Sequence, residues 1–388
     1  MELRPYQHEA RKQLREALKA GGDRYPRPIL CFPTGAGKTV TFSDLASRTI
    51  EKGGTIGVTC HRTELISQAR NTMRMYGVDM TAVHFGMVQT YVRSPHKIPD
   101  ADLWIIDECH IGNFRRFIEL VSNKVIIGAT ATPLSASKKQ PLNKLFDTVV
   151  CPVQISELVE EGYLSTPTYV QYVIDSESLI LGSNGEFTEE SQSKVFSEGN
   201  LTAELAKIES KTIVFTSSIQ AAERAAELCQ AQGVTTYLVH SKMSEDERKE
   251  RVQAFKAYDV NNRAAIVNCS ILTAGFDDPS ICKAIIYRAT TSLPLWLQMV
   301  GRASRIVKSR KSTFTVVDMG GNIERHGRWE MDRDWDAMFR AQGKKKKKQE
   351  AAPIKECIAC QALIPAQSMI CPHCGAEQPR NNADAPNG

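Results

Sequence analysis

Hydrophobic and polar positions follow two different patterns along this chain. Short apolar runs recur from residue 1 to about residue 320, and segments with helical periodicity separate them. The runs are nearly continuous, as in strands that are covered on both faces of a sheet. They predict strands at 28–32, 55–60, 103–106, 125–130, 212–216, 235–240, 264–270, 284–288 and 314–318. Strands that alternate with helices indicate α/β domains with parallel sheets.

Two of the intervening helices have clear boundaries. One has an apolar face across residues 42–50 and ends at Gly53 and Gly54. Another begins after Ser244, because Glu247 stands three residues later and completes a capping box. We expect one α/β domain at 1–160.

A second α/β domain is expected at 165–323. Its start is interrupted at about 175–200, where the polar sequence offers few core positions and indicates a surface excursion. Residues 324–350 are expected to form a helix that packs on the body, followed by a lysine-rich linker (344–348). The last residues, 381–388, have the composition of a disordered tail.

The bulk composition is that of a chain able to bury a core. Of its 388 residues, 42% are hydrophobic and 24% are charged, which is ordinary for a globular protein. No apolar run reaches the roughly 18 residues of a membrane span, and the charged N-terminus does not resemble a signal peptide. We therefore expect a cytoplasmic protein that is not bound to a membrane. The net charge of +5 is compatible with a polyanionic partner.

A glycine-rich segment, PTGAGKT (33–39), directly follows the first apolar run and precedes a helical pattern. Its glycines allow the backbone to present N–H groups to phosphate oxygens, its lysine adds positive charge, and its threonine offers a hydroxyl to Mg²⁺. The strict P-loop pattern has glycine where Phe32 stands, so the match is partial. The expected nucleotide-binding residues are Thr34, Gly35, Ala36, Gly37, Lys38 and Thr39.

The acidic stretch IIDECH (105–110) ends another predicted strand. Asp107 falls where the second Mg²⁺-orienting acid of a P-loop site belongs, and Glu108 can position or deprotonate the attacking water. The same stretch could instead hold a nucleophilic Cys109–His110 pair or a zinc ion. Adjacent strand residues point to opposite sides, and adjacent Cys and His lack zinc-ligand spacing, so both alternatives are disfavoured.

Positive charge for phosphoryl transfer is available in QMVGRASR (298–305). Arg302 and Arg305 are three residues apart, so they lie on one face of a helix and can project into a cleft between domains. An arginine supplied in this way accelerates phosphoryl transfer by orders of magnitude. An arginine pair on a helix is otherwise usually surface charge. The expected catalytic residues are Lys38, Asp107, Glu108, Gln298, Arg302 and Arg305.

Four of the eleven cysteines form two C-x-x-C pairs near the C-terminus. Cys357, Cys360, Cys371 and Cys374 have the spacing of tetrahedral Zn²⁺ ligands, which predicts a zinc ribbon at 351–380. Few apolar residues lie nearby, so the metal would supply most of the folding energy. Redox pairs or unliganded cysteines are the alternatives. The neighbouring lysines favour nucleic-acid contact, against a solvated linker or a protein-docking module.

The ordered set of motifs resembles that of superfamily 2 helicases and translocases over about residues 1–322. LRPYQ (3–7) resembles the adenine-recognition segment of this family. PTGAGKT, TCHRTEL (59–65), DECH and TATP (130–133) resemble its motifs I, Ia, II and III, although motif III has Thr where the family has Ser. Motifs IV, V and VI are resembled by IVFTSS (213–218), NCSILTAGFDDP (268–279) and QMVGRASR.

This resemblance implies two tandem RecA-like domains that bind ATP and Mg²⁺ between them. The implied adenosine contacts are Arg4, Gln7 and Asp277. Coupling between ATP and nucleic acid would involve His110, paired with Gln298, together with Thr130 and Thr132. The implied nucleic-acid contacts are His61, Arg62, Gln89, Thr90, Thr273 and Gly275.

The closest subgroups by resemblance are RadD-like and phage-encoded DNA helicases. The shared features are DECH, the HR-x-EL segment, a GEF…SE stretch near 185–198 and the C-terminal cysteines. The chain is shorter than the RadD pattern, so the partners of RadD proteins are not carried over. The expectation is movement on single-stranded or forked DNA, during repair, recombination or replication, in a bacterium or from a phage. Alternatives are an RNA helicase and an ATPase switch that recruits partners, including proteins bound by the ribbon.

Overall fold

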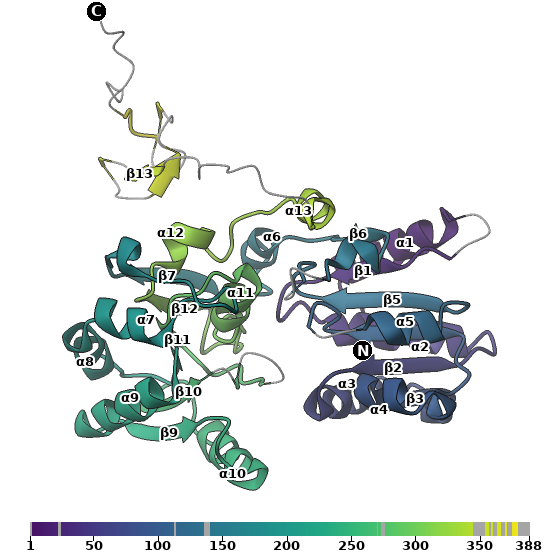
Figure 1. Cartoon of the computed structure of the whole chain (residues 1–388), viewed down its shortest axis with the longest axis horizontal. Coiled ribbons are helices and arrows are strands. Elements are labelled where there is room, and N and C mark those ends of the chain that lie inside the picture. Colours follow the sequence, from purple (N-terminus) through teal and green to yellow (C-terminus); the bar gives the residue numbers. More distant parts are fainter. Residues whose placement is uncertain are drawn as a thin grey trace, which may run out of the picture. The chain divides into compact units, whose positions relative to one another are not determined.

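The computed structural model describes residues 2–21, 25–111, 114–135, 140–269, 271–272, 276–343, 354–356, 358–359, 363–365, 369–370 and 375–378 (Figure 1). The chain divides into two units, Met1–Gln342 and Gly343–Gly388. The first unit contains two parallel six-stranded sheets, and the second contains a short antiparallel pair. We call the two sheets of the first unit, each with its helices, the first lobe and the second lobe.

The first lobe has the strand order β3–β2–β4–β5–β1–β6, with every pair parallel. Its strands are β1 (Pro28–Cys31), β2 (Ile56–Cys60), β3 (Val83–Met87), β4 (Leu103–Asp107), β5 (Val125–Thr130) and β6 (Thr148–Val150). Its helices are α1 (Pro5–Lys19), α2 (Lys38–Ile50), α3 (Thr63–Met75), α4 (Val88–Arg93), α5 (Arg115–Leu120) and α6 (Ile155–Glu160).

The second lobe has the order β7–β12–β11–β8–β10–β9 and is also parallel throughout. Its strands are β7 (Thr166–Gln171), β8 (Thr212–Thr216), β9 (Thr235–Val239), β10 (Ala264–Cys269), β11 (Lys283–Tyr287) and β12 (Thr313–Asp318). Its helices are α7 (Glu189–Val195), α8 (Glu198–Ala206), α9 (Ile219–Ala231), α10 (Glu245–Lys256) and α11 (Leu293–Gly301).

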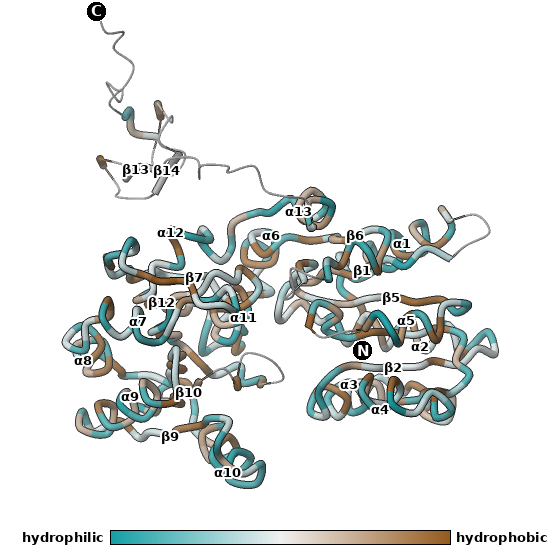
Figure 2. The backbone as a smooth tube through the Cα atoms, viewed as in Figure 1, coloured by the Kyte–Doolittle hydropathy of each residue, from teal (hydrophilic) through white to brown (hydrophobic). Residues whose placement is uncertain are grey.

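The central strands are buried on both faces, as their continuous apolar runs predict. Figure 2 shows apolar stretches along the strands of both lobes. Trp104 on β4 is fully buried and meets Phe117 edge to face, with ring centroids 4.9 Å apart. Gly57 on the neighbouring strand makes room for this indole, since a Cβ there would lie 2.4 Å from Trp104. The prediction of two parallel-sheet α/β domains is confirmed.

The helix boundaries expected for α2 and α10 are close to those observed. The Ser244 hydroxyl accepts a hydrogen bond from Glu247 N at 3.3 Å, and the Glu247 carboxylate accepts one from Ser244 N at 3.0 Å, so the capping box is present. Three strands of the two lobes, β3, β6 and β7, lie outside the strands that the apolar pattern predicts.

The polar excursion near 175–200 is more ordered than its sequence indicates. Leu179 and Phe196 are each 8% exposed and pack with Ala289 of the second lobe. An isolated bridge pairs Leu181 with Phe187 and closes the turn between them. The segment offers few core positions, as expected, but Leu179 and Phe196 hold it against the second lobe.

The segment after residue 323 differs from the single helix expected. It forms two short helices, α12 (Asn322–His326) and α13 (Trp335–Ala341). Trp329, between them, is 1% exposed and donates from Nε1 to Leu297 O on α11 at 3.2 Å. Phe339 on α13 is 2% exposed and joins the apolar core of the first lobe. The segment therefore contacts both lobes.

The second unit is described only in part. Its strands β13 (Ile354–Glu356) and β14 (Leu363–Pro365) pair antiparallel, and a separate bridge joins Ile370 to Glu377. The four cysteines of the predicted ribbon, the lysine run 344–348 and the tail 381–388 lie outside the described residues. Within the described ranges there is no group of three or more metal-ligating side chains. No helix in those ranges is long and apolar enough to cross a bilayer.

The burial of Phe339 predicts that α13 contributes to the stability of the first lobe. Phe339→Ala should lower the free energy of unfolding by about 3–5 kcal/mol, because it leaves a cavity in the first-lobe core. Arg340→Ala on the exposed side of α13 is the matched control and should change it by less than about 0.5 kcal/mol. Urea denaturation followed by circular dichroism measures both. Equal midpoints for the two variants would contradict the packing of α13.

Candidate active site

The P-loop links β1 to α2 at the carboxyl edge of the first sheet. Gly35 and Gly37 have φ of 93° and 80°, which side-chain-bearing residues rarely adopt. A Cβ at Gly37 would also lie 2.6 Å from the Gln7 amide nitrogen. Because α2 begins at Lys38, the N–H groups of its first turn lack helical acceptors and are available to an anion.

Gln7 on α1 supports this loop directly. It is 2% exposed, and its Nε2 donates to Ala36 O at 3.3 Å and Gly37 O at 3.2 Å. Its Oε1 accepts from Arg4 N at 2.9 Å. The Arg4 guanidinium lies 4.5 Å from the centre of the Tyr163 ring. The structure thus places Arg4 and Gln7 beside the P-loop, and their contact with a nucleobase stays a prediction.

The Lys38 ammonium lies between two carboxylates. Its Nζ is 2.8 Å from Asp107 Oδ1 and also forms an ion pair with Glu108. Burial by itself lowers the pKa of Lys38, but the two carboxylates outweigh burial and raise it above its usual value. Burial raises the pKa of Asp107, whereas Lys38 and His110 overcome the effect of burial at Glu108 and lower its pKa. Glu108 is therefore the more readily ionised of the two acids.

Glu108 combines an unusual backbone conformation with a buried carboxylate oxygen, and both features are typical of functional residues. Its φ is 49°, in the left-handed region that non-glycine residues seldom occupy. Its Oε2 is buried, makes no hydrogen bond among the described residues, and has His110 Nδ1 as a neighbour at 3.3 Å. A buried, ionised carboxylate oxygen at this position can accept a proton from a bound water.

The residues at this edge fit the groups that the motifs imply. The glycine-rich loop and Lys38 provide donors for phosphate, while Asp107 provides a hard oxygen ligand of the kind that Mg²⁺ prefers. Thr39 occupies the second position of α2, so its hydroxyl group belongs to the same helix terminus. Thr39 and Asp107 would hold Mg²⁺, which when bound neutralises phosphate charge.

A chain of hydrogen bonds leads from His110 into the second lobe. Thr130 Oγ1 donates to Thr132 O at 2.9 Å, so this oxygen accepts from His110 Nδ1 at 2.7 Å. His110 Nε2 then accepts from Gln298 Nε2 at 3.1 Å. Burial lowers the pKa of His110 to about 4, so the ring is neutral at pH 7 and carries its proton on Nδ1. The predicted pairing of His110 with Gln298 is present.

Cys109 does not share this site with His110. Its thiol is 1% exposed and packs in the first-lobe core, where a Cβ at Gly128 would lie 3.1 Å from Sγ. Burial, followed by the charge of Glu108, raises the pKa of the thiol. The side chains of Cys109 and His110 have separate environments, which argues against a nucleophilic pair.

The expectation that Arg302 and Arg305 share one helix face is wrong, because α11 ends at Gly301, Arg302 caps it, and Arg305 lies in the loop beyond. Arg305 Nη2 is 3.2 Å from Asp277 Oδ1, and a Cβ at Gly35 would lie 3.1 Å from Arg305 Nε. Arg302 donates to Phe276 O. Burial and the neighbouring Arg305 lower the pKa of Arg302 to about 10, so it keeps its charge at pH 7.

A groove of about 1070 Å³ is lined by residues of both lobes. His61 and Arg62 line it, and Gln89 Nε2 donates to His61 O at 3.1 Å, so motif Ia and the segment at 86–91 meet. Both ring nitrogens of His61 are buried without a hydrogen-bond partner among the described residues, and burial lowers its pKa. Thr90 is exposed nearby in sequence, while Thr273 and Gly275 lie outside the described residues.

The same groove contains residues that the motifs do not indicate. Basic side chains from the second lobe line it at Arg248, Lys249, Lys256 and Arg288. The turn of the excursion lines it at Gly182, Ser183, Asn184 and Glu186–Glu189. Glu186 accepts from Thr290 Oγ1 at 2.8 Å and Thr291 Oγ1 at 3.0 Å, which attaches the turn to the residues before α11. The sequence could have indicated the basic residues of α10, because Arg248, Lys249 and Lys256 lie close together along it.

Two parallel-sheet lobes with a P-loop, an acid pair and facing arginines have the arrangement of a nucleic-acid-dependent ATPase of the helicase class. Family models agree with this assignment. Residues 1–98 match the res subunit of type III restriction enzymes, and residues 198–307 match the helicase conserved C-terminal domain.

Curated relatives extend over most of the chain. A 51.5 kDa protein of a Lactococcus phage is 26% identical across 88% of this chain and 76% of its own length. IRC3 of Saccharomyces cerevisiae, named as an ATP-dependent helicase, is 27% identical across 82% of this chain and 52% of its own length. The chain thus spans about half of the length of the yeast protein.

Solved structures share the fold. A fragment of an HsdR subunit of a type I restriction enzyme from Vibrio vulnificus has a TM-score of 0.62 and 20% identity, covering 85% of this chain and 66% of that one. Saccharomyces cerevisiae Dbp5 bound to RNA has a TM-score of 0.54 and 13% identity, covering 87% and 96%. At these identities the likeness concerns the fold alone.

The position of Glu108 generates a direct test. Glu108→Gln should lower kcat for ATP hydrolysis by about a hundredfold or more, because it removes the proton acceptor, while ATP binding is retained. Glu119→Gln, at an exposed carboxylate on α5, is the control and should leave kcat unchanged. Steady-state hydrolysis and equilibrium binding of a fluorescent nucleotide measure the two effects. Unchanged hydrolysis by Glu108→Gln would rule out this role.

Proposed function

We propose that the protein is an ATP-dependent DNA helicase or translocase that hydrolyses ATP between its two lobes. The observation that carries the proposal is the bond between His110 and Gln298, because His110 also neighbours Glu108 and Gln298 lies on α11, which directly precedes the arginine segment. A change in the contacts of Glu108 can therefore alter how the lobes meet.

The chemistry at the lobe interface requires charge and a base. Glu108 takes the proton of the attacking water as it forms a bond to the terminal phosphorus. Lys38, Arg302 and Arg305 stabilise the negative charge on the transferred phosphoryl group and on the leaving ADP. Before nucleotide binds, Lys38 is paired with Asp107 and Glu108. Phosphate therefore competes with the carboxylates for this ammonium.

Nucleotide recognition is assigned to three further residues. Arg4 and Gln7 stand beside the P-loop, where they can contact adenine. Asp277 is 46% exposed and pairs with Arg305, so its second oxygen is accessible to a ribose hydroxyl. The position of all three around one edge supports these roles.

Nucleic acid is assigned to the groove that both lobes line. Arg62, Arg248, Lys249 and Lys256 provide positive charge for phosphates, and His61 provides an unpaired ring. Thr90, Thr273 and Gly275 remain assigned to contact with the nucleic-acid backbone through the resemblance alone.

DNA is favoured over RNA by the restriction-enzyme match of the first 98 residues and by the RadD-like motifs. The phage relative supports action in the cytoplasm of a bacterial host, in repair, recombination or replication.

The C-terminal cysteines are assigned to a Zn²⁺ ribbon. The described strands support this proposal, because β13 and β14 flank the first C-x-x-C pair in the sequence and the Ile370–Glu377 bridge flanks the second. Two short antiparallel pairs around two cysteine pairs are typical of zinc ribbons. The ribbon would contact DNA or a protein partner.

The proposed activity predicts a substrate order. ATP hydrolysis should rise at least about tenfold with single-stranded or forked DNA, less with duplex, and least with RNA. Raising salt from 50 to 200 mM should weaken DNA affinity by orders of magnitude, because phosphate contacts release counterions. A strand-displacement assay run beside the hydrolysis assay separates translocation from an ATPase switch. Greater stimulation by RNA than by DNA would contradict the DNA assignment.

Substitution of a proposed zinc ligand tests the ribbon separately from the ATPase activity. The full chain should bind about one Zn²⁺ per molecule, and Cys371→Ser should lose it, because one thiolate of four is removed. Cys229→Ser, which replaces a buried cysteine far from the ribbon in the sequence, is the control and should leave the zinc content unchanged. Elemental analysis of the purified proteins measures both. Full zinc content in Cys371→Ser would exclude this ligand set.

A further inference from the structure

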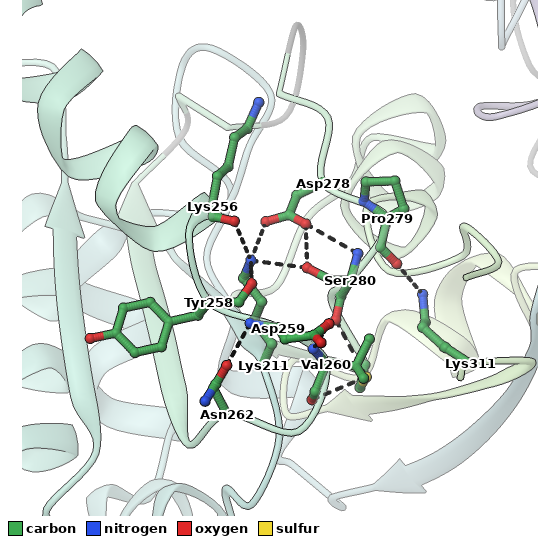
Figure 3. Close-up of polar contacts among 11 residues, drawn as sticks. Lys211, Lys256, Tyr258, Asp259, Val260, Asn262, Asp278, Pro279, Ser280 and Lys311 are labelled. Carbon is green, nitrogen blue, oxygen red and sulfur yellow. Dashed lines mark hydrogen bonds and ion pairs between the residues drawn. The ribbon is translucent and has the colours of Figure 1, made fainter. Parts of the chain in front are cut away.

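Two buried lysines of the second lobe, Lys211 and Lys311, contact the turn at 278–280 (Figure 3). Lys211 is fully buried at the start of β8, and its Nζ is 2.8 Å from Asp278 Oδ2. The same ammonium donates to Ser280 Oγ at 2.9 Å and Tyr258 O at 2.7 Å. Lys211 therefore has a counter-charge and holds the turn at 278–280.

Lys311 differs because its contacts are backbone carbonyls. It is 6% exposed, and its Nζ donates to Pro279 O at 3.1 Å, Ala303 O at 2.6 Å and Arg305 O at 2.5 Å. Three acceptors match the three N–H donors of an ammonium group. No carboxylate within the described ranges forms an ion pair with it, and the nearby Asp278 is already paired with Lys211.

A buried lysine without a counter-charge is costly, so its position calls for a reason. Pro279 comes two residues after Asp277, and Ala303 and Arg305 belong to the arginine segment. The Arg305 carbonyl also accepts from Ser165 Oγ at 2.9 Å, and Ser304 O accepts from Ser165 N at 2.7 Å. Lys311 thus joins the backbone of Arg305 to that of Pro279, two residues after Asp277, and the side chains of Asp277 and Arg305 pair next to the P-loop.

We propose that Lys311 is a positioning residue that sets the backbone of Arg305, and with it the guanidinium that faces the P-loop. This inference rests on the proposed function, in which Arg305 stabilises the transferred phosphoryl group. Lys311 does not touch the substrate. It acts through the carbonyls of residues 279, 303 and 305, and therefore affects the transition state more than ATP binding.

The ionisation of Lys311 provides a readout that needs no substitution. Burial lowers the pKa of Lys311 to about 8, with Arg305 lowering it further and Cys282 and Asp278 acting in the opposite direction. Above pH 8 the neutral amine has two N–H donors for three carbonyls, so one contact is lost. The kcat of the unmodified protein should therefore decline as pH rises through about 8.

Substitution separates positioning from general stability. Lys311→Met should lower kcat by about tenfold to a hundredfold, as expected for a displaced catalytic group, with the KM for ATP changed less than about threefold. Lys311→Arg keeps a charged donor and should recover part of kcat and remove the decline above pH 8. Lys308→Met, at an exposed lysine of the same loop, is the matched control and should behave as the unmodified protein. Thermal unfolding is recorded for each variant so that assays are run on folded protein.

The decisive experiment is a double-mutant cycle with Arg305→Ala. If Lys311 acts through Arg305, Lys311→Met should have little further effect on kcat once Arg305 is absent. Full additivity of the two effects, or a flat pH profile with unchanged kcat in Lys311→Met, would overturn the positioning role. A normal kcat in Arg305→Ala alone would instead overturn the proposed function of that arginine, and with it this inference.

Discussion

The pairing of the Lys38 ammonium with Asp107 and Glu108 is the interaction on which the site depends. A buried ammonium requires counter-charge, and the two acids stand at the end of β4, which only β5 separates from β1, the strand that leads to Lys38. Because parallel strands end at a common edge, the sheet order brings residues 70 positions apart within ion-pair distance. The contact also makes the acids responsive to phosphate, which offers the lysine a competing anion.

A neutral histidine, His110, connects the Lys38–Asp107–Glu108 group to the second lobe. His110 is held in one tautomer by Thr130, and its other nitrogen meets Gln298 on α11, the helix that directly precedes the two arginines. Both contacts are buried, where hydrogen bonds have defined directions and unsatisfied groups are costly. A short series of hydrogen bonds therefore links the chemistry of one lobe to the orientation of the other. This link does not require a large apolar interface.

Much of the fold follows from the sequence, and the exceptions have physical reasons. The strands β1, β4 and β5 are continuous apolar runs because helices cover both faces of the sheet. The edge strand β7 was missed because its residues are mostly exposed or half-exposed and include Pro167. The strand β6 has three residues, too few for a periodic signal. The motifs located the acids and arginines, because local spacing encodes those residues. The contacts of Glu186 with Thr290 and of Lys311 with Arg305 join distant positions, and no local pattern marks them.

The hydrogen bonds of Ser165 to the backbone of residues 304 and 305 have a mechanical consequence. Ser165 stands where the chain passes from the first lobe into the second, so the crossover is fastened to the arginine segment. The crossover and the arginine segment therefore cannot move independently, because a displacement of residues 304 and 305 pulls on Ser165 through two hydrogen bonds.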